Sequence, residues 1–168
     1  LADQKTQFEA IFHGVPDAMI LANAAREVIL VNSAMTRIFG YSPQEVEGRK
    51  TAIFYELPEE FERQGRLRYN LDAEQLFEPF EVNYRRKDGG VFPGETVGTV
   101  IRDEAGVVLG FLGVVRDISE RKRLEQELRQ AAAVFENTTE GVVLTDASGR
   151  VISVNQAFSG ITGYQMHE

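Results

Sequence analysis

An internal repeat constrains the fold of this chain more than any other feature of its sequence. When Asn32 is aligned with Asn155, one offset matches apolar and turn residues without a gap from residue 10 to residue 45. The matched pairs include Phe12/Phe135, Leu21/Leu144, Val31/Val154, Ile38/Ile161 and Gly40/Gly163. Agreement in both spacing and residue type indicates a tandem duplication. The second copy stops at Glu168, so we expect the chain to end inside a domain.

Each copy begins with two strand-like segments and a helix-like segment. In the first copy, residues 18–22 and 28–31 are rich in β-forming side chains and flank a polar turn, which predicts an antiparallel hairpin. Asn32 or Ser33 can cap the helix that follows, and Gly40 can end it. The capping-box spacing of residues 42–45 predicts a second short helix, and a third is expected over residues 58–71.

From residue 80 onward the apolar pattern has a period of two. Phe80, Val82 and Tyr84 alternate with polar residues, which places the apolar set on one face of a sheet. Asp88-Gly89 predicts a hairpin turn, because glycine readily adopts the positive φ angle of a tight connection. Strands are expected over residues 80–85, 91–101 and 107–116. The sequence therefore predicts an α+β domain with a five-stranded antiparallel sheet and short helices on one face.

A charged segment follows the last predicted strand. Leu124, Leu128, Ala131 and Phe135 are separated by four, three and four residues, as in the apolar seam of a coiled coil. This spacing predicts a coiled-coil-like linker helix that would dimerise only weakly on its own. We expect four segments: an N-terminal helical segment (1–13), a complete domain (14–118), a helical linker (119–133) and the start of a second domain (134–168).

Composition excludes several classes of function. The net charge of −8 argues against a surface for nucleic acid or for an anionic membrane. The chain has no cysteine, so disulfides, thiolate metal sites and cysteinyl photochemistry are excluded. Its two histidines, His13 and His167, offer little material for a metal site. We expect no metal, and a cytoplasmic location, because neither a membrane span nor a signal peptide is found.

The order of these motifs resembles the PAS sensory fold with its C-terminal PAC motif. The residues that carry the resemblance are Val31-Asn32-Ser33-Ala34, Phe39-Gly40-Tyr41-Ser42, Arg85-Arg86-Lys87-Asp88-Gly89, Val100-Ile101-Arg102-Asp103 and residues 110–122. The resemblance covers residues 8–119 as one complete domain and residues 135–168 as the opening of a second. It implies a signal junction at Asp117 and Ser119, where bonds to the backbone or to neighbouring side chains couple the last strand to the linker. A simple helix cap is the alternative.

Within this family, cofactor binding leaves marks that this sequence lacks. Haem-binding relatives place a histidine on the helix that corresponds to residues 58–71, and this segment has none. Flavin photosensors of the family use a cysteine. We therefore expect neither a haem nor a cysteine-linked flavin, and an unidentified small molecule remains as the possible ligand.

Strand alternation predicts an internal pocket between the sheet and the short helices. The candidate lining residues are Met19, Leu21, Val82, Tyr84, Phe111, Gly113 and Val115. Gly98 and Gly113 lack side chains where these would fill space, which favours a cavity. The polar residues nearby, Tyr84, Thr96 and Thr99, suggest an apolar or weakly polar ligand. A plain packed core is the alternative, because any such sheet shows this alternation.

The resemblance implies a sensory module of a multi-domain bacterial signalling protein. We expect it to sense a small molecule or a partner, to form a homodimer and to relay the change through the linker helix. Phe8, Ile11 and Phe12 recur at helical spacing ahead of the first strand and are expected to supply dimer contacts. The module is expected not to be an enzyme; a histidine kinase, a cyclic-dinucleotide cyclase or phosphodiesterase, or a transcription regulator would follow it.

Two other functions stay open at this point. The first is a constitutive dimerisation and spacing domain with a filled core and no ligand. The second is a small-molecule enzyme on an α+β scaffold. No pair of nucleophile and base, and no pair of carboxylates, supports the enzyme.

Overall fold

The computed structural model describes residues 2–72 and 78–165. The chain divides into two compact units, one reaching Ser119 and the other beginning at Glu120. Each unit is described by itself. In the described part of the chain, no helix combines the length and the apolar character needed to cross a membrane.

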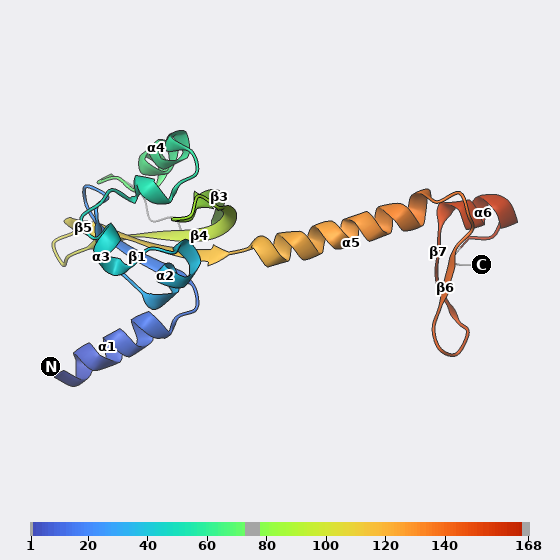
Figure 1. The fold of residues 1–168 in the computed structure, drawn as a ribbon, viewed down its shortest axis with the longest axis horizontal. Helices are drawn as coiled ribbons and strands as arrows, with labels where there is room; N and C mark the ends of the chain where they lie inside the picture. The colour runs from blue at the N-terminus through green and yellow to red at the C-terminus, as the bar shows by residue number, and fades with distance from the viewer. Residues whose placement is uncertain (1, 73–77, 166–168) are drawn as a thin grey trace. The chain divides into compact units, whose positions relative to one another are not determined.

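The first unit is built on the predicted five-stranded antiparallel sheet (Figure 1). Its strands are β1 (Ala18–Asn23), β2 (Val28–Val31), β3 (Phe80–Arg85), β4 (Val91–Arg102) and β5 (Val108–Asp117), in the spatial order β2-β1-β5-β4-β3. Strand β5 is thus central and pairs with β1 on one side and β4 on the other. The α+β fold expected from the sequence is confirmed.

Short helices connect the hairpin to the three-stranded part of the sheet. They are α2 (Ser33–Phe39), α3 (Pro43–Val46), the 3-10 helix η1 (Thr51–Phe54) and α4 (Pro58–Leu67). Helix α4 is shorter than expected and ends at Leu67, where Arg68 leaves the helical conformation. The predicted capping box of α3 is present, with both Ser42 and Glu45 bonded to the backbone.

The core of the first unit lies between these helices and one face of the sheet. Phe39, Phe54 and Phe92 are almost completely buried. The Phe39 ring centroid lies 5.1 Å from that of Phe54 and 5.2 Å from that of Phe92. Burying one such ring stabilises a fold by about 1.5–3 kcal/mol. This aromatic cluster packs the helices against the sheet. One of its members, Phe54, also lines an internal cavity.

Helix α1 (Ala2–Gly14) precedes the sheet and is tied to it by Asn32. The Asn32 amide nitrogen donates to the carbonyl oxygens of Phe12 (3.1 Å) and Asp17 (3.0 Å). Phe12 was expected to be free for a dimer contact, but its side chain is only 5% exposed, so this expectation is wrong. The reason is that the end of α1 folds onto the domain, which leaves Phe8 and Ile11 as its large exposed apolar residues.

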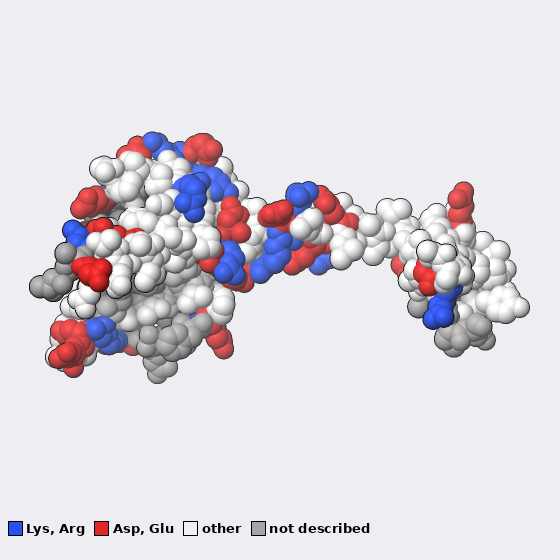
Figure 2. Space-filling view, turned by 90° about the horizontal axis from the view of Figure 1, so that it is seen from below, with Lys and Arg blue, Asp and Glu red and all other residues white. Residues whose placement is uncertain are grey.

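The second unit contains the repeated hairpin and its helix. Helix α5 (Ser119–Asn137) leads into β6 (Val143–Thr145), β7 (Val151–Val154) and α6 (Gln156–Thr162). Acidic and basic side chains are mixed over the first part of α5 (Figure 2), and Arg123 pairs with Glu127 at 2.7 Å. Leu124 and Leu128, two positions of the predicted seam, are exposed.

Candidate functional site

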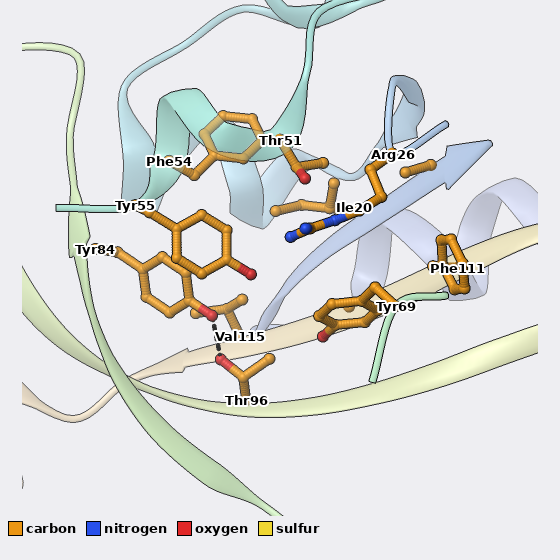
Figure 3. A pocket seen from close by; sticks show the side chains of 12 residues that line it. Ile20, Arg26, Thr51, Phe54, Tyr55, Tyr69, Tyr84, Thr96, Phe111 and Val115 are labelled. Carbon is orange, nitrogen blue, oxygen red and sulfur yellow. Dashed lines mark hydrogen bonds between the residues drawn. The ribbon is translucent and has the colours of Figure 1, made fainter. Parts of the chain in front are cut away.

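A cavity of about 40 Å³ lies between the sheet and the short helices (Figure 3). Its walls come from β1, β3, β4 and β5, from η1 and from the segments that flank β2 and α4. The lining residues are Ile20, Ala22, Arg26, Thr51, Phe54, Tyr55, Tyr69, Tyr84, Thr96, Phe111, Gly113 and Val115. Space of this size holds about three water molecules. It therefore suits a molecule of only a few non-hydrogen atoms.

The structure brings four of the seven expected pocket residues to this cavity. Tyr84, Phe111, Gly113 and Val115 line it. Val82 belongs to the packed core beside it and is 5% exposed.

Met19 and Leu21 were assigned to the wrong face of β1. Ile20 pairs with Gly113 and Ala22 with Phe111, so Ile20 and Ala22 share the inner face with these lining residues. Met19 and Leu21 alternate with them and are half-buried on the other face. Apolar residues occupy both faces of this strand, so its sequence pattern did not reveal which set points inward.

Two hydroxyl groups meet inside the cavity wall. The Tyr84 hydroxyl and Thr96 Oγ1 are 2.6 Å apart and share a hydrogen bond. Burial raises the pKa of Tyr84 well above its usual value, so this phenol stays protonated at neutral pH. Thr99, expected as a third polar group, pairs with Leu112 and lies on the opposite face of the sheet. That expectation is wrong because strand residues three apart point to opposite faces.

Tyr69 occupies the space that the two glycines leave open. A Cβ atom at Gly98 would lie 2.4 Å from the Tyr69 hydroxyl oxygen, and one at Gly113 would lie 3.9 Å from it. The Tyr69 ring also meets Phe111 edge to face, with centroids 5.6 Å apart. The glycines therefore accommodate a tyrosine from outside the sheet, and the cavity is what remains around it.

Arg26, which the sequence analysis did not single out, brings a positive charge to the cavity. It lies in the turn between β1 and β2, and Figure 3 shows its guanidinium pointing inward. Its Nη1 donates to the Phe61 carbonyl oxygen at 2.8 Å, and its Cζ lies 3.6 Å from the centre of the Phe61 ring. Burial lowers the pKa of Arg26, although the nearby Tyr55 and Tyr69 oppose this. At a guanidinium this still leaves the charge in place at neutral pH.

The second candidate site is the junction at the end of β5. Asp117 Oδ1 accepts from the Ser119 amide (2.9 Å) and from Ser119 Oγ (2.6 Å), and Asp117 Oδ2 accepts from Arg86 at 2.6 Å. Arg86 also donates to the Ile38 carbonyl oxygen and stacks on Phe92, 4.1 Å from the ring centre. Asp117 therefore joins the first residue of α5 to the body of the domain.

The electrostatics of the junction favour an ionised Asp117. Burial raises the pKa of this carboxyl group, but hydrogen bonds from Ser119 and Arg86 outweigh burial and leave the pKa below its ordinary value. Both expected residues, Asp117 and Ser119, are thus in direct contact. Arg86 was not assigned to the junction from the sequence, because 31 positions separate it from Asp117.

The expectation that this chain binds neither a haem nor a cysteine-linked flavin stays a prediction. Helix α4 carries no histidine, and the cavity beside it measures about 40 Å³. Among the residues the structure describes, no three His, Asp or Glu side chains come together as a metal site would require. His13 bonds to Ser33 (Nδ1 to the amide nitrogen, 3.1 Å), whereas His167 lies outside the described residues.

Two protein-family models match this chain, one in each unit. The family described as "PAS fold" matches residues 6–118, and a second family described as "PAS domain" matches residues 128–168. The chain is similar to the sensor protein FixL of Bradyrhizobium diazoefficiens, with 25% identity over 98% of this chain and 33% of that protein. It is also similar to the sensor protein TdiS of Thauera aromatica, with 30% identity over 80% of this chain and 24% of that protein.

A solved structure has a similar fold and a related sequence. The PAS domain of an HTR-like protein from Haloarcula marismortui superposes with a TM-score of 0.57 and 26% identity, over 70% of this chain and 93% of that one. The chain spans about a third or less of the length of the two sensor proteins.

Proposed function

Because this chain belongs to the PAS family, we propose that its first unit is a sensory module that binds a small molecule in the cavity and signals through α5. Its relatives include sensor proteins and a histidine kinase, which supports a place in signal transduction. The catalytic output, a histidine kinase or a cyclic-dinucleotide enzyme in our proposal, would lie outside this sequence.

One observation carries the proposal: the cavity and the junction share strand β5. Phe111, Gly113 and Val115 line the cavity, and Asp117 ends the same strand two residues later. The Ile118 amide then donates to the Pro93 carbonyl oxygen at 3.1 Å, so the end of β5 is also bonded to β4. A ligand that displaces β5 would move Asp117 and the Ile118 amide with it, because both lie at the end of the same strand. The start of α5 would respond.

A cavity-filling variant tests this coupling without knowledge of the ligand. In Gly113→Ala the new methyl group would lie 3.9 Å from the Tyr69 hydroxyl oxygen, an ordinary contact that partly fills the cavity. We expect hydrogen exchange at the Ile118 and Ser119 amides to change. Gly160→Ala is the control, because a Cβ atom there meets open space in the second unit. Unchanged exchange at the junction would argue against the relay.

The module would act as a homodimer. Phe8 and Ile11 on α1 and Leu124 and Leu128 on α5 are large exposed apolar residues, which supports self-association through these helices. Sedimentation of the whole chain at high micromolar concentration should show a dimer. A monomer under these conditions would exclude the dimeric relay.

A constitutive spacing domain is the second candidate, and the position of Tyr69 favours it. This ring already fills the space beside Gly98 and Gly113, as expected for a closed core. Native mass spectrometry of the purified protein distinguishes the two functions. A bound small molecule supports the sensor, and its absence together with a cavity that takes up no added ligand supports the spacer.

A further inference from the structure

We propose that the cavity binds a small carboxylate, about the size of formate or acetate, and that Arg26 Nη2 is the donor that selects it. This inference rests on the proposed function, because it takes the cavity to be a ligand site. It assigns the chemical class of the ligand and names the residue that recognises it.

The first argument is an unsatisfied bond. Arg26 Nη2 is buried and has no acceptor within hydrogen-bond distance among the described residues, while Nη1 is held by the Phe61 carbonyl oxygen. The Tyr55 hydroxyl lies near the guanidinium and opposes the lowering of the Arg26 pKa by burial, but it carries no negative charge at neutral pH. A buried donor without an acceptor costs about 1–3 kcal/mol, and more when it is charged. A carboxylate oxygen would supply both the acceptor and the opposite charge. Figure 3 shows the guanidinium facing the cavity, where such an oxygen would sit.

The second argument is that the backbone at this position does not favour an arginine. Arg26 has φ +61°, and it is the only non-glycine residue with a positive φ in the described part of the chain. In the second copy of the repeat the corresponding residue is Gly149, with φ +84°. A side chain in this conformation costs about 1 kcal/mol, a cost that glycine avoids. The first copy therefore tolerates strain to place a guanidinium here.

Helix α4 is also built to admit this side chain. A Cβ atom at Gly65 would lie 2.4 Å from Arg26 Nη1, so only glycine leaves room for the guanidinium at its present position. Glycine inside a helix costs about 0.5–1 kcal/mol relative to alanine. Two separate elements thus carry unfavourable backbone choices that together position one cation.

Among the described residues, no carboxylate forms a hydrogen bond or ion pair with Arg26, although Glu62 acts on it from a longer distance and opposes the lowering of its pKa by burial. Glu27 is engaged by Asn23 (3.0 Å) and Lys50 (3.5 Å), and Glu60 by Gln64 (2.6 Å) and Arg63 (3.3 Å). Burial raises the pKa of Tyr55 to about 12, despite the nearby Arg26, and burial also raises the pKa of Tyr69. Both phenols are therefore neutral at pH 7 and can donate to an anion but cannot replace one.

The remaining walls and the volume set the size of the ligand. Ile20, Ala22, Phe54 and Val115 present apolar surface that suits a methyl or methylene group. Space for about three waters accommodates a carboxylate with a very short tail. Longer acids would need Tyr69 to leave its position over the glycines.

The test compares acetate with acetamide, a neutral molecule of nearly the same shape. Calorimetric titration of the complete chain, at ionic strength held constant with chloride, should show acetate binding at least about tenfold more tightly than acetamide. Formate should bind and ethanol should not. Arg26→Gly should abolish the preference for acetate, whereas Arg66→Gln, an equal charge loss at an exposed position of α4, should leave it unchanged.

A second variant and an NMR signal from Arg26 distinguish a loss of acetate binding from misfolding. Gly65→Ala favours the helix but pushes against Arg26 Nη1, so it should fold and still weaken acetate binding severalfold. In the unmodified protein, acetate should shift the Arg26 side-chain NH resonance. Equal binding of acetate and acetamide would overturn the inference and leave the sensor intact. Failure of every small molecule to bind would overturn both.

Discussion

The two copies of the hairpin share their polar contacts but differ in what they bury. Asn32 and Asn155 are each 1% exposed, and each accepts from two backbone amides. Each also donates to two matched carbonyl oxygens, those of Phe12 and Asp17 in the first copy and of Phe135 and Glu140 in the second. These partners occupy corresponding positions of the repeat, and Asn32 makes one further, longer contact with the Val15 carbonyl oxygen (3.5 Å).

The apolar residues of the two hairpins have different surroundings. Val28 is 3% exposed, whereas its counterpart Val151 is 47% exposed. The difference arises because Val28 belongs to a core cluster that includes Val82 and Val115 from the later strands of the first unit, whereas β6 and β7 pair only with each other among the described strands. The asparagine contacts depend on nearby residues, while burial depends on strands that lie much later in the chain.

The repeat also shows that α5 serves both units. Phe135, near its end, offers its carbonyl oxygen to Asn155 just as Phe12 of α1 does to Asn32. Its first residue, Ser119, is bonded to Asp117. In each copy a helix is fixed to the hairpin by one asparagine. Helix α5 is therefore bonded to the last strand of the first copy at its beginning and to the hairpin of the second copy near its end.

The largest effect should come from removing matched apolar side chains. Met35 is fully buried under the sheet and Phe158 is its counterpart. Met35→Ala should lower the free energy of unfolding of the first unit by about 2–5 kcal/mol, because it opens a cavity in a packed core. Phe158→Ala should leave that transition unchanged. Urea denaturation of both variants, followed by circular dichroism, checks the difference; equal losses would show that the two units unfold as one.

The asparagine substitutions test whether the shared contacts matter equally. Asn32→Ala should cost the first unit about 2–3 kcal/mol, since it strands the buried amides of Met19 and Met35. Asn155→Ala should instead loosen the second hairpin, seen as faster hydrogen exchange at Val142 and Phe158. If Asn155→Ala destabilises the first unit as much as Asn32→Ala, the local interpretation of these contacts is wrong.

Much of this fold could be predicted, and the failures have a common cause. The hairpins, caps and turns follow from neighbouring residues, as the Asn32 cap and the Asp88-Gly89 turn show. The roles of Met19 and Ile20 could not be separated, because both faces of β1 are apolar and only its pairing with β5 decides between them. Tyr69 and Arg86 reach their partners across long stretches of chain, which no local pattern encodes.

Arg26, unlike Tyr69 and Arg86, could be identified from the sequence. Its alignment with Gly149 was available from the repeat, and an arginine in place of a turn glycine was a usable signal. The polarity of the turn alone does not show that position 26 has a positive φ angle.

Two aspartates with similar serine contacts, one in each unit, allow the same kind of comparison at the junction. Asp117 and Asp146 each accept from the amide and the hydroxyl of a serine two residues later, at 2.9 and 2.6 Å. Asp117 also accepts from the side chain of Arg86, whereas Asp146 accepts from the backbone amide of Arg150. Asp117→Asn should cost about 1 kcal/mol at neutral pH, a modest value because both partners are partly exposed. Asp146→Asn should leave the first unit unchanged.

The pH dependence of stability tests whether the ionised form of Asp117 stabilises the folded protein. The folded pKa of Asp117 lies below its unfolded value, so its contribution is present above the unfolded pKa and is lost as pH falls through the folded one. Acid titration of the unfolding free energy should therefore be shallower in Asp117→Asn than in the unmodified protein. Identical acid profiles would show that Asp117 contributes no charge-dependent stability.

The smallest expected effect comes from exchanging the two turn residues. Gly149→Arg should destabilise the second hairpin by about 1 kcal/mol, because a side chain at φ +84° is strained and a Cβ atom there meets no neighbour. Arg26→Gly relieves the same strain but loses the bond to the Phe61 carbonyl oxygen and the stacking on that ring. These contributions nearly cancel, so the stability of the first unit should change by less than about 1 kcal/mol. A much larger loss would show that Arg26 chiefly holds α4 in place, and hydrogen exchange along α4 would locate that role.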